Sequence, residues 1–451
     1  MPNLAGAALL AAVLLPSAAF SGVRVGAAKR TITPDLEKHG PVYMAGFGHN
    51  RRATGVHDDL YARCIAFSTG RRPLVICGVD VIGIFWDDVR RIRSKVDADV
   101  VIAALHDHEA PDTMGLWGPS AAQSGINETY VSFLVDRTAE AARDAIQSLS
   151  PAHIRLAKIR TPELDTFIDD TRPPVVHDPE IIVLRADTVG GQPIATLINW
   201  ANHPETLGSE NTRLTADYSG YLYREAERLL GGTAVFVNGA IGGMQSPLGS
   251  TVKDSTGKVL PEKTFDKAEF IGVRVANLAA EALGNAGPLA IDSIRFTERL
   301  INIPMTNPGF QMAAKAGIFG ARKQPNADGT TTTPVGYISF GHSGRAVLEI
   351  ALVPGELYPE LSVGGVVKYE GADLPDAPVE PAVKQQMTAP FRMLFGLADD
   401  EIGYIIPRME WDEKAPFLQN APKAWYGEVN SLGPEAAPRI TRTLQEMIKR
   451  K

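Results

Sequence analysis

An apolar segment near residue 100 ends abruptly in histidines flanked by acids. The segment VVIAAL (100–105) is followed by HDHEAP, which places His106 and His108 two positions apart. Because side chains alternate along an extended backbone, the two imidazoles are expected to point the same way. Both could therefore bind one metal ion, or one could bind it while the other contacts a substrate. The alternative is a pair of solvated histidines with no chemical role.

Three other segments carry metal-ligand residue types where the chain leaves a strand. TLINWAN is followed by His203, EIALVPG is followed by Glu356, and DDEIGYIIP contains Tyr404. Ligand sites of α/β proteins lie beyond the carboxyl ends of strands, so these residues are expected to meet His106 there. Two imidazoles, a carboxylate and a phenol would make a zinc site with one position left for water.

Two further polar residues adjoin these segments. Asp80 ends the segment VICGVD, and Asn202 precedes His203. A metal-bound histidine usually donates its other ring nitrogen to a carboxylate or a carbonyl, so both residues are candidates for that role. Zinc lowers the pKa of bound water to about 7, which supplies a hydroxide to attack an amide or ester carbonyl. We expect zinc, together with His108 or Tyr404, to stabilise the oxygen anion, and a nearby carboxylate or imidazole to protonate the leaving group. Asp80 is also a catalytic candidate.

The elements that must position these residues alternate along the chain. Several predicted strands are continuous apolar runs rich in Val and Ile, which is typical of strands covered on both faces. The sequence therefore predicts one large α/β domain with a mixed, largely buried β-sheet flanked by helices. Strands are predicted at 60–68, 73–84, 100–105, 180–186, 194–201, 233–238 and 346–353, and helices at 86–98, 129–149, 219–230, 266–283 and 434–450.

Long surface loops are predicted in the polar or Gly/Pro-rich stretches 209–214, 253–263, 324–334 and 372–386. Loops of this length in a compact domain often edge or cover a site. The segment NPGFQMAAKAGIF (307–319) is expected either to cover the cleft with apolar side chains or to belong to the ordinary core.

Composition and the N-terminal segment limit the function classes. The chain has 451 residues and a net charge of −7, which argues against a nucleic-acid-binding surface. The segment LAGAALLAAVLLPSAAF is short for a membrane span and is followed by small residues. Residues 1–19 are therefore predicted to be a secretory signal peptide, with export to the periplasm or the medium. A buried first helix is the alternative.

The two cysteines lie in a predicted hairpin, LYARCIAFSTGRRPLVICGVD. A turn centred on Gly70 and Arg71 would place Cys64 directly opposite Cys77. Adjacent-strand disulfides are strained and buried thiols are common, so we expect two packed free thiols.

Several motifs, in order along the chain, resemble the N-terminal catalytic domain of the neutral/alkaline (non-lysosomal) ceramidase family. The resemblance runs from about residue 26 to the C-terminus. The motifs are ITP, GFG, GVHDDLYAR, LHDHEAP, VHDPEIIVLRAD, INWANHPETL, LTADYSGY, VPGE, GYIIPRMEW and YGEVNSLGPE. LHDHEAP stands where the family has His-Thr-His-Ser-Gly-Pro, and VPGE matches its Pro-Gly-Glu.

This resemblance implies a ligand set. Carried over residue by residue, it assigns the zinc ligands to His106, His203, Glu356 and Tyr404, and it places His108 beside the substrate carbonyl. Residues 22–451 would form the zinc hydrolase domain, and the family's C-terminal β-sandwich domain is not expected in this chain.

The sequence departs from the family in two places. The family's Gly-Asp-Met-Ser-Pro segment reads NGAIGGMQSPLG here, so Gln245 takes the place of a serine implicated in catalysis and Ser246 is displaced by one. Ser246 is therefore a weak catalytic candidate, and a turn serine before Pro247 is the alternative. The second departure places Asp107 and Glu109 beside His108, which is expected to make the rim of the site acidic.

The function expected from these residues is zinc-dependent hydrolysis of an amide, such as a ceramide-like N-acyl lipid. The alternatives are a zinc hydrolase of polar amides or esters and an exported zinc-containing binding protein without activity. The expected partner is a small-molecule or lipid substrate, with transient contact to a membrane surface and no nucleic acid. The sequence does not predict an oligomeric state.

Overall fold

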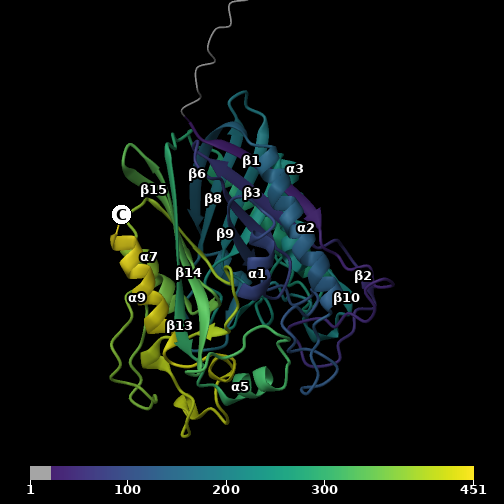
Figure 1. The fold of residues 1–451 in the computed structure, drawn as a ribbon, viewed down its shortest axis with the longest axis vertical. Helices are drawn as coiled ribbons and strands as arrows, with labels where there is room; N and C mark the ends of the chain where they lie inside the picture. Colours follow the sequence, from purple (N-terminus) through teal and green to yellow (C-terminus); the bar gives the residue numbers. More distant parts are fainter. Residues whose placement is uncertain (1–21, 451) are drawn as a thin grey trace, which may run out of the picture.

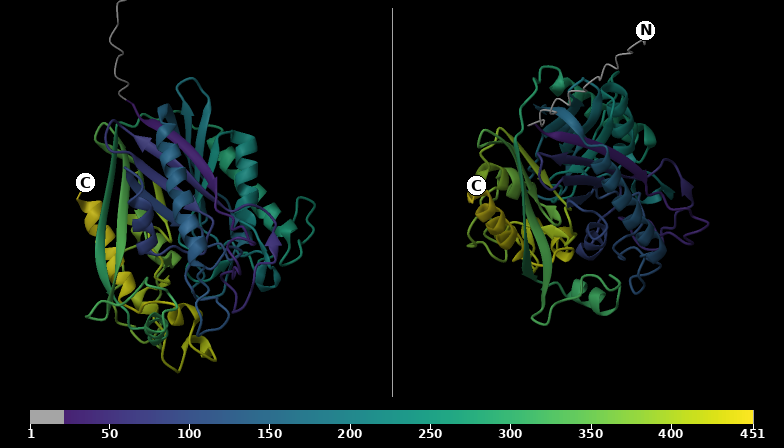
Figure 2. Two further views of the ribbon diagram at one scale, coloured as in Figure 1. Left: turned by 45° about the vertical axis from the view of Figure 1, so that its right-hand side comes forward. Right: turned by 45° about the horizontal axis from the view of Figure 1, so that its top comes forward.

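The computed structural model describes residues 22–450, so the predicted signal peptide lies outside the described residues. Two β-sheets pack face to face, and helices cover the two outer faces (Figure 1; Figure 2). The predicted α/β class with a mixed, buried sheet is confirmed. The structure adds a second sheet, which covers the face of the large sheet opposite its main helices.

The large sheet has eight strands in the order β11-β9-β8-β6-β1-β3-β4-β5. The pairs β4–β5 and β9–β11 are parallel and the other pairs are antiparallel, so the sheet is mixed. Its strands are β1 (Arg24–Thr31), β3 (Tyr61–Ser68), β4 (Leu74–Val79), β5 (Asp99–Ala104), β6 (Ser150–Arg160), β8 (Glu180–Thr188), β9 (Pro193–Trp200) and β11 (Thr233–Asn238).

Helices cover the outer face of this sheet because each presents an apolar stripe to it. One apolar cluster joins β3, β4 and β5 to α1 (Trp86–Arg93) and α2 (Glu128–Gln147). Another joins β8, β9 and β11 to α3 (Asp217–Leu230) and α4 (Phe265–Leu283). Two of these helices begin where a side chain accepts a backbone N–H: Asn127 caps α2 and Thr264 caps α4.

The second sheet has the order β13-β14-β15-β17. Its strands are β13 (Ser293–Pro304), β14 (Thr330–His342), β15 (Arg345–Leu352) and β17 (Phe391–Phe395). Ile338, Phe340 and Ile350 face the large sheet, and α9 (Ala436–Lys449) packs on the other side. The stretch 324–334 was expected to be a loop throughout. It instead enters β14 at Thr330, because the threonines at 330–333 pair with β13.

The remaining elements are short and lie mainly in connections. They are β2 (Gly55–Val56), β7 (Asp169–Asp170), β10 (Arg213–Leu214), β12 (Gln245–Ser246), β16 (Glu356–Leu357), β18 (Tyr404–Ile405), α5 (Pro308–Lys315), α6 (Pro359–Val363), α7 (Val383–Gln386) and α8 (Tyr426–Val429). Among residues 22–450, no helix has both the length and the apolar character to cross a membrane.

The expectation of two free thiols is wrong. Cys64 in β3 pairs with Cys77 in β4, and the two form a disulfide. The two residues lie directly opposite each other in the antiparallel pair, and their Cα atoms are 4.1 Å apart. The register predicted from the turn was correct, but the chemistry inferred from it was not.

Candidate metal centre

The large sheet is folded so that its edge strand β11 lies close to β4 and β5 at the other side of the sheet. A side chain on Gly78 of β4 would meet the backbone oxygen of Phe236 of β11 at 2.3 Å, so glycine permits this approach. At the end of β11, the Asn238 amide donates to the carbonyl oxygens of Leu105 and Asn202, at 3.0 and 2.8 Å. Asn238 thereby ties the residue before His106 to the residue before His203.

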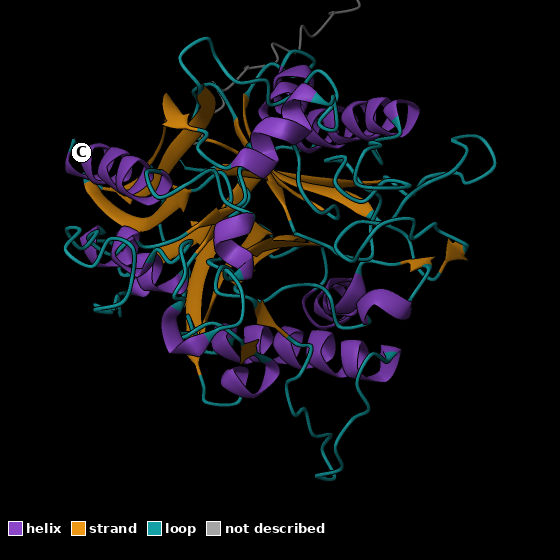
Figure 3. Ribbon diagram, turned by 90° about the horizontal axis from the view of Figure 1, so that it is seen from below, coloured by secondary structure: helices purple, strands orange, loops and turns teal. Residues whose placement is uncertain are grey.

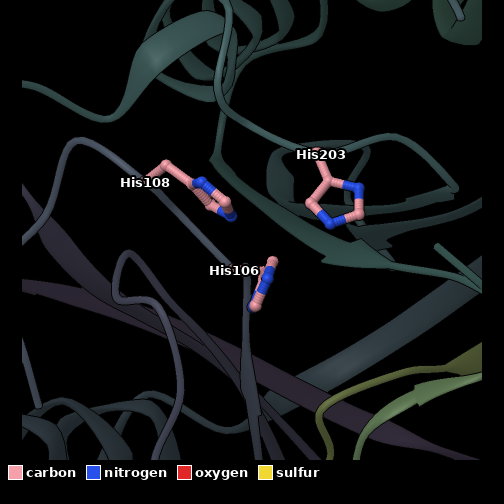
Figure 4. Close-up of side chains that lie close together, drawn as sticks. All are labelled: His106, His108 and His203. Carbon is pink, nitrogen blue, oxygen red and sulfur yellow. The ribbon is translucent and has the colours of Figure 1, made fainter. Parts of the chain in front are cut away.

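Three histidines meet at this end of the sheet. His106 and His108 follow β5 and His203 follows β9, and Figure 4 shows their rings around a common space. One ligand nitrogen of each lies within 4.8 Å of the others, and all three residues are buried. Figure 3 views the molecule from the end where α5 lies in Figure 1, with loops crossing in front of the strands.

Backbone carbonyls orient two of these rings. Nδ1 of His106 lies 2.8 Å from the oxygen of Ile82, and Nδ1 of His203 lies 2.5 Å from the oxygen of Gln245. A carbonyl can only accept, so Nδ1 carries the hydrogen in both rings and Nε2 is the free ligand atom. His106 also has a φ of 64°, a left-handed conformation that is costly for a residue other than glycine.

Glu356 faces the two free nitrogens. Its Oε2 lies 3.1 Å from Nε2 of His203 and 3.4 Å from Nε2 of His106. Burial lowers the pKa of His106 to about 4, so that ring is neutral near pH 7. Burial alone would raise the pKa of Glu356, but His106, His203 and Tyr404 outweigh burial and keep it below its ordinary value.

This arrangement calls for a proton or a metal ion between the three groups. Burial alone would lower the pKa of His203, but its hydrogen bond to Glu356 and the charges of Glu205 and Glu356 outweigh burial and raise it, so a proton on Nε2 of His203 is the alternative to a metal ion. A neutral Nε2 and a carboxylate oxygen are both acceptors, so their approach is favourable only with a proton or a metal ion between them. Ligand atoms at about 2.0–2.1 Å from a tetrahedral zinc ion lie roughly 3.3 Å from one another. The observed separations of 3.1 and 3.4 Å fit that geometry. The residues present therefore fit a zinc ion.

Tyr404 joins the group through a short parallel strand pair. β16 pairs with β18 so that Glu356 lies directly beside Tyr404, and the two side chains are hydrogen-bonded. The hydroxyl of Tyr404 also contacts Sδ of Met244 at 3.1 Å. Burial raises the pKa of Tyr404 well above its ordinary value, so without a metal the phenol remains protonated.

His108 is fixed by neighbours that differ from those of the other two histidines. Its Nδ1 lies 3.1 Å from Oε2 of Glu205, although the contact lacks hydrogen-bond geometry. Its backbone N–H donates to Pro204, and a Cβ on Gly46 would come within 2.3 Å of its ring. The carboxylate of Glu205 favours the hydrogen on Nδ1, which leaves Nε2 of His108 as an acceptor.

Two of the three histidines, His106 and His108, line a cavity. Its walls are mainly apolar and include Met114, Trp117, Met305, Phe310, Phe319 and Leu432. Glu356 and Tyr404 also line it. Phe310 and Phe319 belong to the segment 307–319, so this segment supplies apolar wall as the sequence indicated.

Glu401 is a buried carboxyl group in the same cavity that the sequence did not single out. Its Oε1 accepts the N–H of Gly403 at 2.7 Å, and its Oε2 has no hydrogen-bond partner among the described residues. Burial and the charge of Glu356 raise the pKa of Glu401 well above its ordinary value. In the sequence, only its position three residues before Tyr404 suggested that Glu401 lies near the site.

Asp80 and Asn202 do not have the contacts expected of them. Asp80 accepts from the backbone of Tyr61 at 2.7 Å and from the hydroxyl of Tyr223 at 2.9 Å. The side chain of Asn202 donates to the oxygen of Phe167, behind the site. The backbone carbonyls of Ile82 and Gln245 orient the histidines instead, and any residue type could have supplied them.

The expectation of an acidic rim is wrong. Asp107 and Glu109 are 1% and 0% exposed, and neither lines the cavity. Asp107 accepts the backbone N–H of Glu109, and Glu109 pairs with Arg51 at 3.2 Å. The two side chains turn inward, and this leaves the cavity wall apolar. One oxygen of each, Oδ2 of Asp107 and Oε1 of Glu109, has no hydrogen-bond partner among the described residues.

Ser246 lies next to the site, and Glu205 stands between it and His108. Its hydroxyl is hydrogen-bonded to Glu205 and accepts the N–H of Leu248 at 3.0 Å. The side chain of Gln245 donates to the oxygen of Val176, away from the metal ligands. Glu205 itself was missed, although its position two residues after His203 in NHPE was a clue in the sequence.

Fold and site together define an α/β protein with a candidate metal centre beside an apolar cavity. No family model and no curated protein matches the chain. Solved structures that share its fold include two ceramidases. Neutral ceramidase from Pseudomonas aeruginosa has a TM-score of 0.69 and 16% identity over 95% of this chain and 75% of that chain. A ceramidase complexed with C2 has a TM-score of 0.69 and 17% identity over the same shares.

With a sequence identity of 16–17%, the likeness to these two structures shows a shared fold. The chain has a neutral ceramidase-like fold, and the resemblance inferred from the ordered motifs is confirmed at that level. The roles of individual residues rest on the geometry described above.

Proposed function

We propose that the protein is a zinc-dependent hydrolase that cleaves the amide bond of a ceramide-like N-acyl lipid. One observation carries the proposal: two imidazole nitrogens and a carboxylate oxygen face one another at 3.1 and 3.4 Å beside an apolar cavity. The fold shared with the two ceramidases supports the reaction class.

His106, His203 and Glu356 would hold the ion, with Tyr404 as the fourth ligand. When bound there, zinc supplies Lewis acidity and lowers the pKa of water to about 7. The carbonyls of Ile82 and Gln245 keep both Nε2 atoms directed at the ion.

The chain's own residues then bind the substrate and move protons. The apolar wall accommodates the acyl chain and excludes water from the scissile bond. Nε2 of His108, whose Nδ1 faces the carboxylate of Glu205, accepts the proton that the attacking water loses and returns it to the leaving nitrogen.

The burial of Asp107 and Glu109 removes the main argument for a polar substrate. An exported binding protein with a structural zinc remains the competing function. Chelation separates the two, because a catalytic metal is needed for turnover whereas a structural metal contributes chiefly to folding.

The test combines elemental analysis, chelation and a substrate panel of N-acyl lipids, acyl amino acids and simple esters. We expect close to one zinc per chain, loss of N-acyl lipid hydrolysis on chelation, and recovery when zinc is returned. A metal-free protein that remains active would refute the proposal. Chelation that lowers the Tm of a protein inactive on every substrate would favour the binding protein.

We also propose that the protein is exported. The segment 1–19 has the pattern of a secretory signal, and the disulfide between Cys64 and Cys77 is a bond that persists in oxidising compartments. N-terminal sequencing of the protein from the periplasm or the medium should find a start near Phe20. Full-length protein confined to the cytoplasm would contradict this.

A further inference from the structure

Three chain segments that contribute wall to the apolar cavity share an unusual composition. They are 113–127, 305–321 and 421–433, and together they form what we call the mouth segments. The first contains no charged residue, the second contains Lys315, and the third contains Lys423 and Glu428. Glu428 is 1% exposed and is ion-paired with Arg172. The exposed charges of the mouth segments are therefore two lysines, in a chain with a net charge of −7.

Hydrogen bonds join the mouth segments into one continuous surface. The hydroxyl of Ser124 donates to the oxygen of Ile318 at 2.6 Å, which links the first segment to the second. The side chain of Asn307, which caps α5, donates to the oxygen of Val429 at 2.9 Å, which links the second to the third. In Figure 1, α5 lies at the lower end of the molecule, and Figure 2 shows the yellow C-terminal segments beside it.

Large apolar side chains project outward from this surface. Met312 on α5 is 67% exposed, and Tyr426 and Val429 on α8 are 50% and 48% exposed. Phe310 lines the cavity, whereas Met312, two positions further along α5, points to the other side. Apolar side chains thus stand on both sides of the wall, toward the cavity and toward the molecular surface.

From this surface we infer that the mouth segments dock on an anionic lipid surface, with Met312 and Val429 entering the headgroup region and Lys315 and Lys423 contacting the headgroups. The inference rests on the proposed function for its purpose, because a lipid-like substrate must leave a membrane or micelle to reach the cavity. Shallow apolar insertion combined with basic residues is the usual basis of reversible interfacial binding.

Charge favours a lipid surface over a second copy of this chain. Two copies meeting through the mouth segments would bring Lys315 and Lys423 of each toward the same basic residues of the other. An anionic bilayer instead offers opposite charge to both lysines, while the rest of the acidic chain is repelled. This orients the molecule with its cavity toward the lipid.

The test measures sedimentation with vesicles of phosphatidylcholine alone or with an equal part of phosphatidylglycerol. We expect the wild type to bind the mixed vesicles, and Met312→Glu and Val429→Glu to bind them at least about tenfold more weakly. Lys315→Gln and Lys423→Gln should each weaken binding to the anionic vesicles about fivefold. The matched control is Val189→Glu, because Val189 is 52% exposed in the β8–β9 hairpin, at the opposite end of β9 from His203.

Hydrolysis of a water-soluble, short-acyl amide by Met312→Glu should equal that of the wild type. A wild type that binds neither vesicle, or a Val189→Glu variant that loses as much binding as Met312→Glu, would overturn the inference. So would a dimer in analytical ultracentrifugation that Met312→Glu dissociates. Vesicle binding requires no turnover, so a protein that binds vesicles but hydrolyses nothing would refute the proposed function and leave this inference intact.

Discussion

Two groups of buried ionisable side chains lie at the same end of the molecule, and they differ in how their polar atoms are satisfied. In the metal-side group, His106, His203 and Glu356 direct acceptor atoms at one another and line or adjoin the cavity. In the second group, which we call the sealed group, Asp80 and Asp217 are each bound by donors from the protein itself.

The sealed group is held by donors from the protein itself, although Oδ2 of Asp217 has no hydrogen-bond partner among the described residues. Asp217 accepts the hydroxyl of Thr206 and the backbone N–H of Tyr218, both at 2.6 Å. Asp80 accepts a backbone N–H and a tyrosine hydroxyl. Buried polar groups that are paired in this way hold a fold together, whereas acceptors that face each other require a shared proton or a bound metal ion. Burial alone therefore does not distinguish a functional group from a structural one; the partners do.

The largest expected effect is that of His203→Ala. Removing one imidazole takes away a proposed metal ligand and leaves Glu356 without its closest partner. Loss of a residue that only orients a ligand costs roughly 10–100-fold in metal affinity or activity, so loss of the ligand itself should exceed about 100-fold in both. Zinc content and turnover of the purified variant are the measurements. Full zinc content in His203→Ala would show that His203 is not a metal ligand, and the two groups would then no longer differ in this respect.

Glu205→Gln tests whether His108 belongs with the metal ligands or only moves protons. The substitution keeps the shape of the side chain but removes the charge beside Nδ1 of His108. We expect zinc content to be unchanged and kcat to fall roughly 10–100-fold, with a smaller change in KM, because His108 acts on protons rather than on the metal. A loss of zinc would instead make His108 a ligand, and an unchanged kcat would leave Glu205 structural.

The sequence predicted the parts of the fold that are buried on both faces. The apolar runs 100–105, 194–201 and 233–238 correspond to β5, β9 and β11 within one residue at each end. The strands β1 and β6 were missed. Both carry several charged residues, and they pair with each other across a long stretch of sequence, so neither shows an apolar run or a hairpin pattern. The second sheet was largely missed for a related reason. Its strand β13 is mostly exposed or half-buried, so it lacks the continuous apolar run that marks a buried strand.

The site was predicted where a residue type is itself informative. Histidines and a glutamate at strand ends indicate a metal site whatever their neighbours are, and the structure brings His106, His203 and Glu356 together. Their orienting partners could not be predicted, because two of them are main-chain carbonyls. Asn238, which ties together the two histidine-bearing strand ends, looks in the sequence like any polar residue that ends a strand.

Asp80→Asn tests the sealed group through the pH dependence of stability. Burial raises the pKa of Asp80 to about 7, above the value near 3.9 expected when unfolded. The folded state therefore binds this proton more tightly, and its contribution to stability falls as pH rises from about 4 to about 7. The amide mimics the protonated acid, so the unfolding free energy of the wild type relative to the variant should decrease by about 2–3 kcal/mol between pH 5 and pH 8.

Denaturant unfolding of both proteins at the two pH values measures this difference. Hydrolysis by Asp80→Asn should stay within about threefold of the wild type, because the side chain contacts Tyr61 and Tyr223 rather than the histidines. A variant of normal stability without activity would place Asp80 in the catalytic machinery after all. A pH-independent difference in stability would mean that Asp80 is already ionised when folded.

The smallest effect is expected for Ser246→Ala, which tests where the metal-side group ends. Its hydroxyl reaches Glu205, which in turn reaches His108, so the serine is two contacts away from a group that moves protons. Removing one such hydrogen bond costs about 1 kcal/mol of stability, and most of the activity should remain because Glu205 stays buried beside His108. Thermal unfolding and kcat measure the two quantities. An inactive but folded Ser246→Ala would mean that the hydroxyl acts on the substrate directly, and the boundary drawn at Glu205 would then have to include β12.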